Sequence, residues 1–226
     1  MSGKRDTRST KSNVTKILVC FAVREEAAAF QTLVPNRDDV SILITGVGRS
    51  NAEGVLIARL RACLPRLVFT CGFAGGLDPE LKLGDVVFET ENCDMALCQR
   101  LTAARARPAK FFCAARIATT AAEKRELHRA TDADAVEMES AAIHAVCRGA
   151  RVSCATVRVI SDTAEEDLPL DFNRLANVDL SVNYAKLAWA VAKSPGKIPA
   201  LLRLHKNTTF AAKQLAEVLE KVIWPK

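Results

Sequence analysis

The sequence predicts an α/β protein of three layers, α/β/α, in which helices cover both faces of a twisted, mixed central sheet. Continuous apolar runs of strand length alternate with segments of helical composition, and strands of that kind are typically buried on both faces. Glycine-rich segments follow two of the runs, where turns are expected. The chain has 226 residues, 49% of them apolar, which is enough for one large domain with a sizeable core.

The N-terminal part of the domain places an acidic residue at a strand-to-helix junction. Residues 1–13 are polar and basic, so we expect a disordered tail and then a single domain over residues 14–226. The first strand, Lys16–Val23, runs into a helix that starts at Arg24–Phe30 and carries Glu26 in its first turn. The helix dipole favours acidic side chains there, so this position alone does not require a function.

The next two expected strands, Val40–Thr45 and Leu67–Cys71, both end in glycines. Gly46–Asn51 follows the first of them, and its glycines would let backbone N–H groups approach a ligand closely. The pattern lacks the third glycine of a dinucleotide-binding motif, so no nicotinamide or flavin cofactor is expected. Gly72–Gly76 follows the second strand, and a structural turn and a ligand-facing turn are both open there.

The remaining elements are expected from apolar periodicity and capping residues. In the middle of the chain we expect a strand at Leu83–Phe88, a helix around 96–106, a strand at Phe111–Ala118 and a helix at Ala121–Arg129, capped by Thr119 or Thr120. Toward the end we expect helical structure from Val182, a break at Ser194–Pro199 and an amphipathic helix over about Thr208–Val222.

The stretch Ala135–Cys147 carries two carboxylates, Glu137 and Glu139, on either side of Met138. Its small and aliphatic residues predict a helix of about three turns. Acidic residues at the start of such a helix could be explained by the helix dipole alone. We therefore interpret Glu137 as structural and keep Glu139 as a site candidate because of the strand that comes next in the chain.

That strand, Cys154–Ile160, ends abruptly in Ser161 and Asp162. α/β proteins place site residues at the carboxyl ends of buried strands, although a carboxylate there can also serve as a simple cap. Asp162 is therefore a candidate for the same site as Glu139.

Composition narrows the class of protein. The net charge is +6, but no basic patch interleaved with aromatic residues indicates nucleic-acid binding. The eight cysteines include no CxxC pair and show no metal-ligand spacing with the three histidines, so no metal and no disulfide framework are expected. These features fit the reducing cytoplasm. No apolar run reaches the length of a transmembrane helix.

Four patterns, in order, resemble the nucleoside phosphorylase superfamily, and most closely its hydrolytic branch, the methylthioadenosine/S-adenosylhomocysteine nucleosidases. They are Ala22–Glu26, Thr45–Gly48, Gly72–Leu77 with Lys82–Asp85, and Val136–Glu139 with Arg158–Asp162. The resemblance extends from about residue 16 to 190. It implies an enzyme that cleaves the N-glycosidic bond of a purine nucleoside and works without a cofactor.

The resemblance also implies roles for individual residues. Asp162 corresponds to the general acid that donates a proton to N7 of the purine, and Glu26 to the carboxylate that activates water. Glu139 corresponds to the residue that holds the ribose hydroxyls. The other residues expected to contact substrate are Met138 against the sugar, Phe172 and Ile117 near the base, and Phe73 and Gly48 in the two glycine segments.

Several alternatives stay open at this point. Phosphate could replace water as the nucleophile, and a non-catalytic nucleoside sensor of the same superfamily is a second class of function. The stretch between Asp85 and Ile117 is short for the family, which suggests a different, larger 5′ group on the substrate.

The C-terminal part suggests what that group is. Leu168–Arg174 and Lys197–Leu204 resemble a phosphorylase-like subgroup associated with hopanoid lipid synthesis, to which adenine removal from adenosylhopane is attributed. Such a basic, apolar segment would suit peripheral contact with a membrane, although a helix packed on the sheet with its lysines in water is the more common explanation of such a segment. The resemblance further implies a homo-oligomer, most simply a dimer.

Overall fold

A computed structural model describes residues 16–35, 37–175 and 193–225. In this part of the chain eight strands form one sheet, six of them in the order β2-β1-β3-β8-β4-β5, with β7 pairing to β3 and β6 pairing to β7. The strands are β1 (Ile17–Phe21), β2 (Val40–Ile44), β3 (Leu67–Gly76), β4 (Val86–Phe88), β5 (Arg107–Pro108), β6 (Phe111–Cys113), β7 (Ala135–Glu137) and β8 (Ser153–Asp162).

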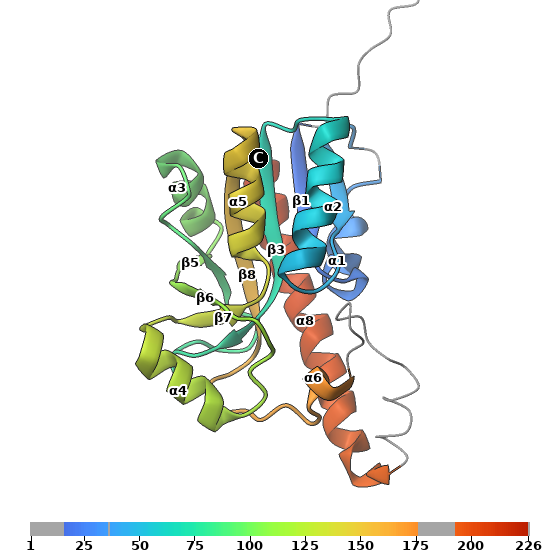
Figure 1. Cartoon of the computed structure of the whole chain (residues 1–226), viewed down its shortest axis with the longest axis vertical. Coiled ribbons are helices and arrows are strands. Elements are labelled where there is room, and N and C mark those ends of the chain that lie inside the picture. Colours follow the sequence, from blue (N-terminus) through green and yellow to red (C-terminus); the bar gives the residue numbers. More distant parts are fainter. Residues whose placement is uncertain (1–15, 36, 176–192, 226) are drawn as a thin grey trace, which may run out of the picture.

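Helices cover both faces of the sheet, so the predicted three-layer architecture is confirmed (Figure 1). The helices are α1 (Arg24–Gln31), α2 (Arg49–Ala62), α3 (Met95–Ala103), α4 (Ala121–Thr131), α5 (Ser140–Ala150), α6 (Phe172–Leu175) and α8 (Ile198–Ile223), the last preceded by the short 3₁₀ helix η1 (Pro195–Lys197). Side chains alternate along each strand: Leu18 packs in the cluster of α2 and α5, whereas Val19 packs in that of α1 and α8.

The longest strands, β3 and β8, run side by side and parallel through the middle of the sheet. Their pairing continues from Leu67 and Ser153 to a bulge at Ala74/Gly75, after which Gly75 lies opposite Asp162. Strand β1 is also parallel to β3. The carboxyl ends of these strands therefore meet at one edge of the sheet, where α/β proteins bind their ligands.

The stretch from Ala135 does not begin as a helix, as the sequence suggested. Its first three residues form strand β7, and α5 starts only at Ser140. Two neighbours account for the difference, because β7 pairs with β3 on one side and with β6 on the other. Glu137 then accepts the N–H groups of Glu139 and Ser140, which provides the first turn of α5 with a cap.

Other boundaries also differ from expectation. Gly72–Gly76 belongs to β3 rather than to a turn, because pairing with β8 and then with β7 extends the strand. The strand expected over Phe111–Ala118 ends at Cys113, and the final helix begins ten residues early, at Ile198. The tail 1–13 and the segment 182–192 lie outside the described residues.

The expected cap of α4 is confirmed at Thr120, whose side chain accepts the N–H of Glu123. Among the described residues, no helix combines the length and the apolar character needed to cross a bilayer.

Candidate active site

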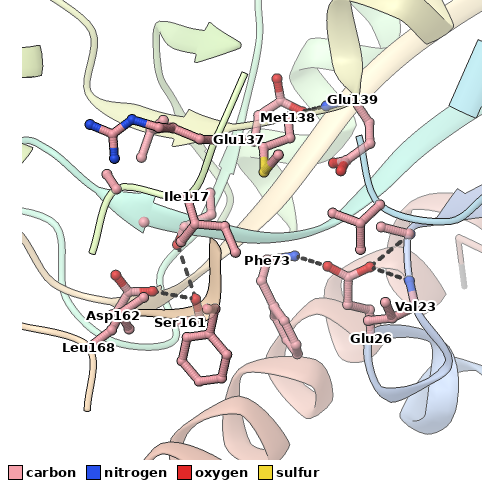
Figure 2. Close-up of a pocket in the computed structure, with 18 of the residues that line it drawn as sticks. Val23, Glu26, Phe73, Ile117, Glu137, Met138, Glu139, Ser161, Asp162 and Leu168 are labelled. Carbon is pink, nitrogen blue, oxygen red and sulfur yellow. Dashed lines mark hydrogen bonds between the residues drawn. The ribbon is translucent and has the colours of Figure 1, made fainter. Parts of the chain in front are cut away.

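A cavity of about 220 Å³ lies at the carboxyl ends of the central strands. Asp162 lies on one side of this cavity, and Glu26 and Glu139 lie on the other (Figure 2). Of the eight residues predicted from the sequence to form the site, seven line the cavity: Glu26, Phe73, Ile117, Met138, Glu139, Asp162 and Phe172. Segments far apart in the chain are therefore brought together around one volume of small-molecule size.

The carboxylate of Glu26 is held by backbone N–H groups at the junction of β1 and α1. Its Oε2 accepts the N–H groups of Ala22 at 2.8 Å and Val23 at 3.2 Å, and its Oε1 accepts that of Phe73 at 2.8 Å. Burial of the carboxyl raises the pKa of Glu26 to about 7 despite these hydrogen bonds and the nearby Arg158. A carboxyl that titrates near neutral pH is suited to accept a proton during catalysis.

A glycine at position 72 is required by the approach of Glu26 to β3. Gly72 has φ of +147°, and a Cβ atom there would lie 2.5 Å from Oε1 of Glu26 and 2.7 Å from Nη1 of Arg158. Both distances are shorter than any real contact of a Cβ atom. The glycine segment after Cys71 thus leaves room for two buried charged groups.

Glu139 is positioned by the other glycine segment. Its Oε1 accepts the N–H of Gly48 at 2.9 Å, and its Oε2 lies 3.5 Å from Nη2 of Arg158. Gly48 was expected to contact substrate, but Val47 lines the cavity in its place. Gly48 instead orients the carboxylate of Glu139 through its N–H. Burial, with repulsion from Glu137, raises the pKa of Glu139.

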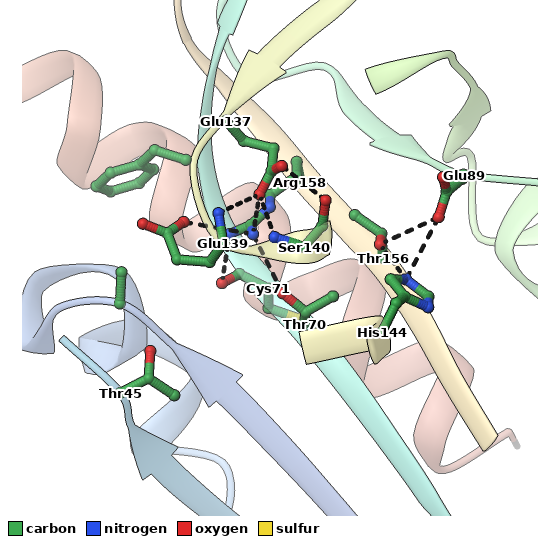
Figure 3. A network of polar contacts seen from close by, with 12 residues as sticks. Thr45, Thr70, Cys71, Glu89, Glu137, Glu139, Ser140, His144, Thr156 and Arg158 are labelled. Atoms are coloured by element: carbon green, nitrogen blue, oxygen red, sulfur yellow. Dashed lines mark hydrogen bonds and ion pairs between the residues drawn. The ribbon is translucent and has the colours of Figure 1, made fainter. Parts of the chain in front are cut away.

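A fully buried arginine connects the carboxylates beneath the cavity (Figure 3). Arg158 donates to Glu137 at 2.6 Å, to the carbonyl of Cys71 at 2.9 Å and to Thr70 at 3.1 Å. Burial raises the pKa of Glu137, but Arg158 and the hydrogen bonds from Ser140 and its neighbours outweigh it, so the pKa of Glu137 is lowered overall. This pattern supports the structural interpretation of Glu137.

Asp162 ends β8 and has a protein partner on each carboxyl oxygen. Ser161 Oγ donates to Oδ1 at 2.7 Å, and Nζ of Lys124, from α4, forms an ion pair with Oδ2. One lone-pair direction of each oxygen remains for another partner. The carboxyl can therefore face the cavity while it is held from behind.

Apolar side chains form the remaining wall of the cavity. Phe73, Ile117, Met138 and Phe172 line it together with Leu204 from α8. Asn173, next to Phe172, accepts the N–H of Ile117 at 2.9 Å and donates to its carbonyl at 3.0 Å. This pair of hydrogen bonds fixes the two hydrophobic sides of the cavity relative to each other.

Sequence reasoning gave no role to Arg158 or Lys124, although both hold site carboxylates. Arg158 lies within one of the four family-like patterns, and an arginine inside an apolar strand is itself a signal of a buried ion pair. The neighbours of Lys124 in the sequence are charged, so the local pattern does not indicate a buried residue. Helical spacing nevertheless places it three residues after Ala121 on the inner face of α4.

Fold and site together define an α/β protein with a carboxylate-lined cavity for a small molecule at the carboxyl ends of its strands. The chain belongs to the phosphorylase superfamily, whose family model matches residues 19–114 and 111–193. The resemblance noted in the sequence is thereby confirmed at the level of the superfamily.

Individual relatives are consistent with this membership. The 5′-methylthioadenosine/S-adenosylhomocysteine nucleosidase of Glaesserella parasuis is 29% identical over 170 residues, which cover 61% of this chain and 74% of that protein. The solved structure of the Helicobacter pylori enzyme of the same name has a TM-score of 0.66 and 17% identity, covering 93% of this chain and 98% of that one. The futalosine hydrolase of Helicobacter pylori gives a TM-score of 0.63 and 18% identity, with 92% and 98% covered. These relatives are enzymes by name, which agrees with the expectation of an enzyme.

Proposed function

We propose that the protein is a purine nucleosidase that hydrolyses the N-glycosidic bond of an adenosine-type nucleoside with a modified 5′ group and releases adenine. The observation that carries this proposal is the convergence of Glu26, Glu139 and Asp162 on one cavity. Hydrolysis of a nucleoside needs an acid for the base, a base for water and a group that holds the sugar. The three carboxylates supply these three roles.

In the proposed reaction the bond between C1′ of the ribose and N9 of the purine breaks, and its electron pair moves to the purine. Asp162 donates its proton to N7 of the leaving base. The oxygen of a water molecule bonds to C1′, and Glu26 takes the proton that this water loses. The products are the free base and the sugar, and both carboxyls return to their starting state by exchanging a proton with water.

Glu139 and Met138 are assigned to the sugar. The N–H of Gly48 is donated to Oε1 of Glu139, and Oε2 lies 3.5 Å from Nη2 of Arg158, so Oε2 is assigned to the ribose hydroxyls. Met138 lines the cavity beside it and offers an apolar surface to the sugar ring. Phe73, Ile117 and Phe172 provide flat or branched apolar surfaces for the base.

Water is favoured over phosphate as the nucleophile because of the charges around the cavity. Glu26 and Glu139 are both buried, and either of them in its ionised form would repel a phosphate dianion. Phe73 occupies the place in the glycine segment where a small hydroxyl residue commonly stands in the superfamily. There are two alternatives. One is phosphate-dependent cleavage of the nucleoside, and the other is a member of the superfamily that binds nucleosides without cleaving them.

The 5′ group is proposed to be apolar. Leu204 of α8 lines the cavity together with Val23 and Val47, which favours an apolar substituent over a charged one. This agrees with the resemblance to the hopanoid-associated subgroup and with an adenosyl lipid as substrate.

The start of α8 is proposed to contact membranes peripherally. It exposes Ile198 and Leu202 among the basic residues Lys197, Arg203 and Lys206. Apolar and basic side chains together are typical of segments that lie at a membrane surface.

The experiment that tests this function measures free base. The purified protein is incubated with methylthioadenosine, S-adenosylhomocysteine, inosine and an adenosyl lipid, each with and without phosphate. We expect adenine release that does not depend on phosphate, with the highest kcat/KM for an apolar 5′ group. A strict requirement for phosphate would replace hydrolysis by phosphorolysis. Binding of a nucleoside without release of base would favour the sensor.

We further propose that the protein is a homodimer located in the cytoplasm. The dimer is inferred from the resemblance, and the eight free thiols agree with a reducing compartment. Light scattering of the purified protein at several concentrations measures the subunit number directly.

A further inference from the structure

Lys124 is a cation without exposed surface, and the chemistry proposed for the three carboxylates assigns it no role. The residue lies on the inner face of α4 and is 0% exposed. Lysine is almost never buried completely unless its ammonium group is paired, and an unpaired buried charge is strongly unfavourable. The partners of Lys124 therefore indicate why the chain keeps a charge at this position.

The ammonium group has three partners that match its three N–H donors. Nζ donates to the carbonyl of Thr163 at 2.7 Å and to that of Glu166 at 3.0 Å, and it forms an ion pair with Oδ2 of Asp162. Its hydrogen-bonding capacity is thus completely used, as expected of the charged form. Glu166 also accepts the N–H of Thr163 at 3.0 Å, so the segment after β8 closes around the ammonium group.

The neighbouring strand leaves space for this ion pair. Gly75 of β3 lies opposite Asp162, and a Cβ atom there would lie 3.3 Å from Oδ2 of Asp162 and 3.8 Å from Cε of Lys124. Ser161 holds the other carboxyl oxygen at 2.7 Å. Residues of α4, β3 and β8 thus fix the position of one carboxyl group at the edge of the cavity.

We propose that Lys124 is a positioning residue for the general acid Asp162. Lys124 holds the carboxyl of Asp162 toward the base and stabilises the carboxylate that forms when Asp162 gives up its proton. The inference rests on the proposed function. As the C1′–N9 bond breaks, the proton of Asp162 moves to N7 and a negative charge appears on Asp162. A fixed positive charge next to that carboxyl lowers the energy of the transition state more than that of the ground state.

Other charged groups also surround Asp162. Glu26, Glu137, Glu139 and Arg116 line the same cavity. Behind Asp162 a second cavity of about 720 Å³ is lined by Arg125, Glu165, Glu166, Asp167 and Arg203. All of them remain in a Lys124 variant, so a difference between the variant and the parent protein reports on Lys124.

The test compares kcat and KM of adenine release for the parent protein, Lys124→Gln, Lys124→Met and Lys124→Arg. The matched control is Arg129→Gln, which removes a cation from the exposed face of the same helix. We expect the two neutral variants to lose about 10²-fold in kcat with little change in KM. Lys124→Arg should restore most of the lost kcat, because it keeps a cation beside Asp162, and Arg129→Gln should change neither kcat nor KM.

Thermal unfolding of each variant identifies those that fold. If Lys124→Met does not fold, the comparison uses Lys124→Gln, whose side chain can still hydrogen-bond the two carbonyls. An unchanged kcat in a folded neutral variant, or a kcat of Lys124→Arg no higher than that of Lys124→Gln, would overturn the inference and leave Lys124 a purely structural residue. Failure of the parent protein to release base from any nucleoside would instead contradict the proposed function. The two failures are therefore distinguishable.

Discussion

Burial and hydrogen bonding act in opposite directions on the carboxyl of Glu26. The removal of water favours its neutral form, whereas the charge of Arg158 and three backbone N–H groups favour its ionised form. The balance leaves the pKa of Glu26 at about 7. The side chain is therefore available both as an acceptor of the proton of water and as a group that returns this proton to solvent.

The first prediction concerns this titration. Glu26 is ionised above its pKa, so kcat/KM should rise as pH increases through about 7. Glu26→Gln should lose roughly 10²- to 10⁴-fold in kcat/KM, and its residual activity should lack the rising limb. Steady-state adenine release, followed across the neutral pH range and on both sides of it, measures both effects. The control is Glu25→Gln, at an exposed neighbouring position, whose pH profile should match that of the parent protein. If the rising limb persists in Glu26→Gln, the titration that causes it belongs to another group.

Arg158 allows a prediction about stability. Its buried guanidinium compensates Glu137 and Glu139, and burial disfavours this charge while the surrounding carboxylates raise its pKa. Arg158→Met would leave these carboxylates without their cation. We expect the free energy of unfolding to fall by about 3–5 kcal/mol, measured by urea denaturation at neutral pH. A loss within about 1 kcal/mol, the range of an exposed ion pair, would show that the carboxylates are neutralised by protonation instead.

At the scale of elements, the sequence predicted the strands that enter the core better than the segments at their ends. The run at Lys16–Val23 is a strand in the structure because burial on both faces specifies it locally. The run at Val40–Thr45 forms the edge strand β2, which is mostly half-buried, and its branched apolar residues favour a strand. Ala135–Glu137 and Gly72–Gly76 were assigned wrongly, because their strand conformation depends on pairing with segments distant in the chain. Tertiary pairing of this kind overrides local propensity.

The same strand extension supplies the third prediction. Gly72→Ala would place a methyl group against Glu26 and Arg158, so we expect a loss of about 1–3 kcal/mol in the free energy of unfolding together with lower kcat/KM. The control is Gly54→Ala in α2, where a Cβ atom would meet nothing within 4 Å. That variant should be more stable by about 0.5–1 kcal/mol, since alanine is the better helix former. Equal effects at the two positions would contradict the steric argument.

At the scale of the whole molecule, the sequence predicted three of the carboxylates that line the cavity but not what holds them. Glu26, Glu139 and Asp162 were expected from the resemblance and from the strands and helices around them. Lys124 does not, because nothing local distinguishes a lysine that points into the protein from one that points to water. Only the packing of α4 against the segment after β8 assigns it to Asp162. Supporting groups of this kind are defined by tertiary structure rather than by local sequence pattern.

The last prediction uses the net charge of +6 and the start of α8. An anionic bilayer should attract the protein through its basic residues, and Leu202, which is 65% exposed, should enter the interface. We expect co-flotation with vesicles of phosphatidylglycerol, weaker flotation with phosphatidylcholine alone and loss of binding as salt is raised. Leu202→Asp should reduce flotation, whereas Met95→Asp, at an exposed apolar position on α3, changes the net charge equally and should have a smaller effect. If the two variants behave alike, attraction to the vesicles depends on net charge only and α8 makes no specific contact. If the parent protein does not float at all, α8 faces water. An adenosyl lipid would then have to leave the bilayer to reach the cavity.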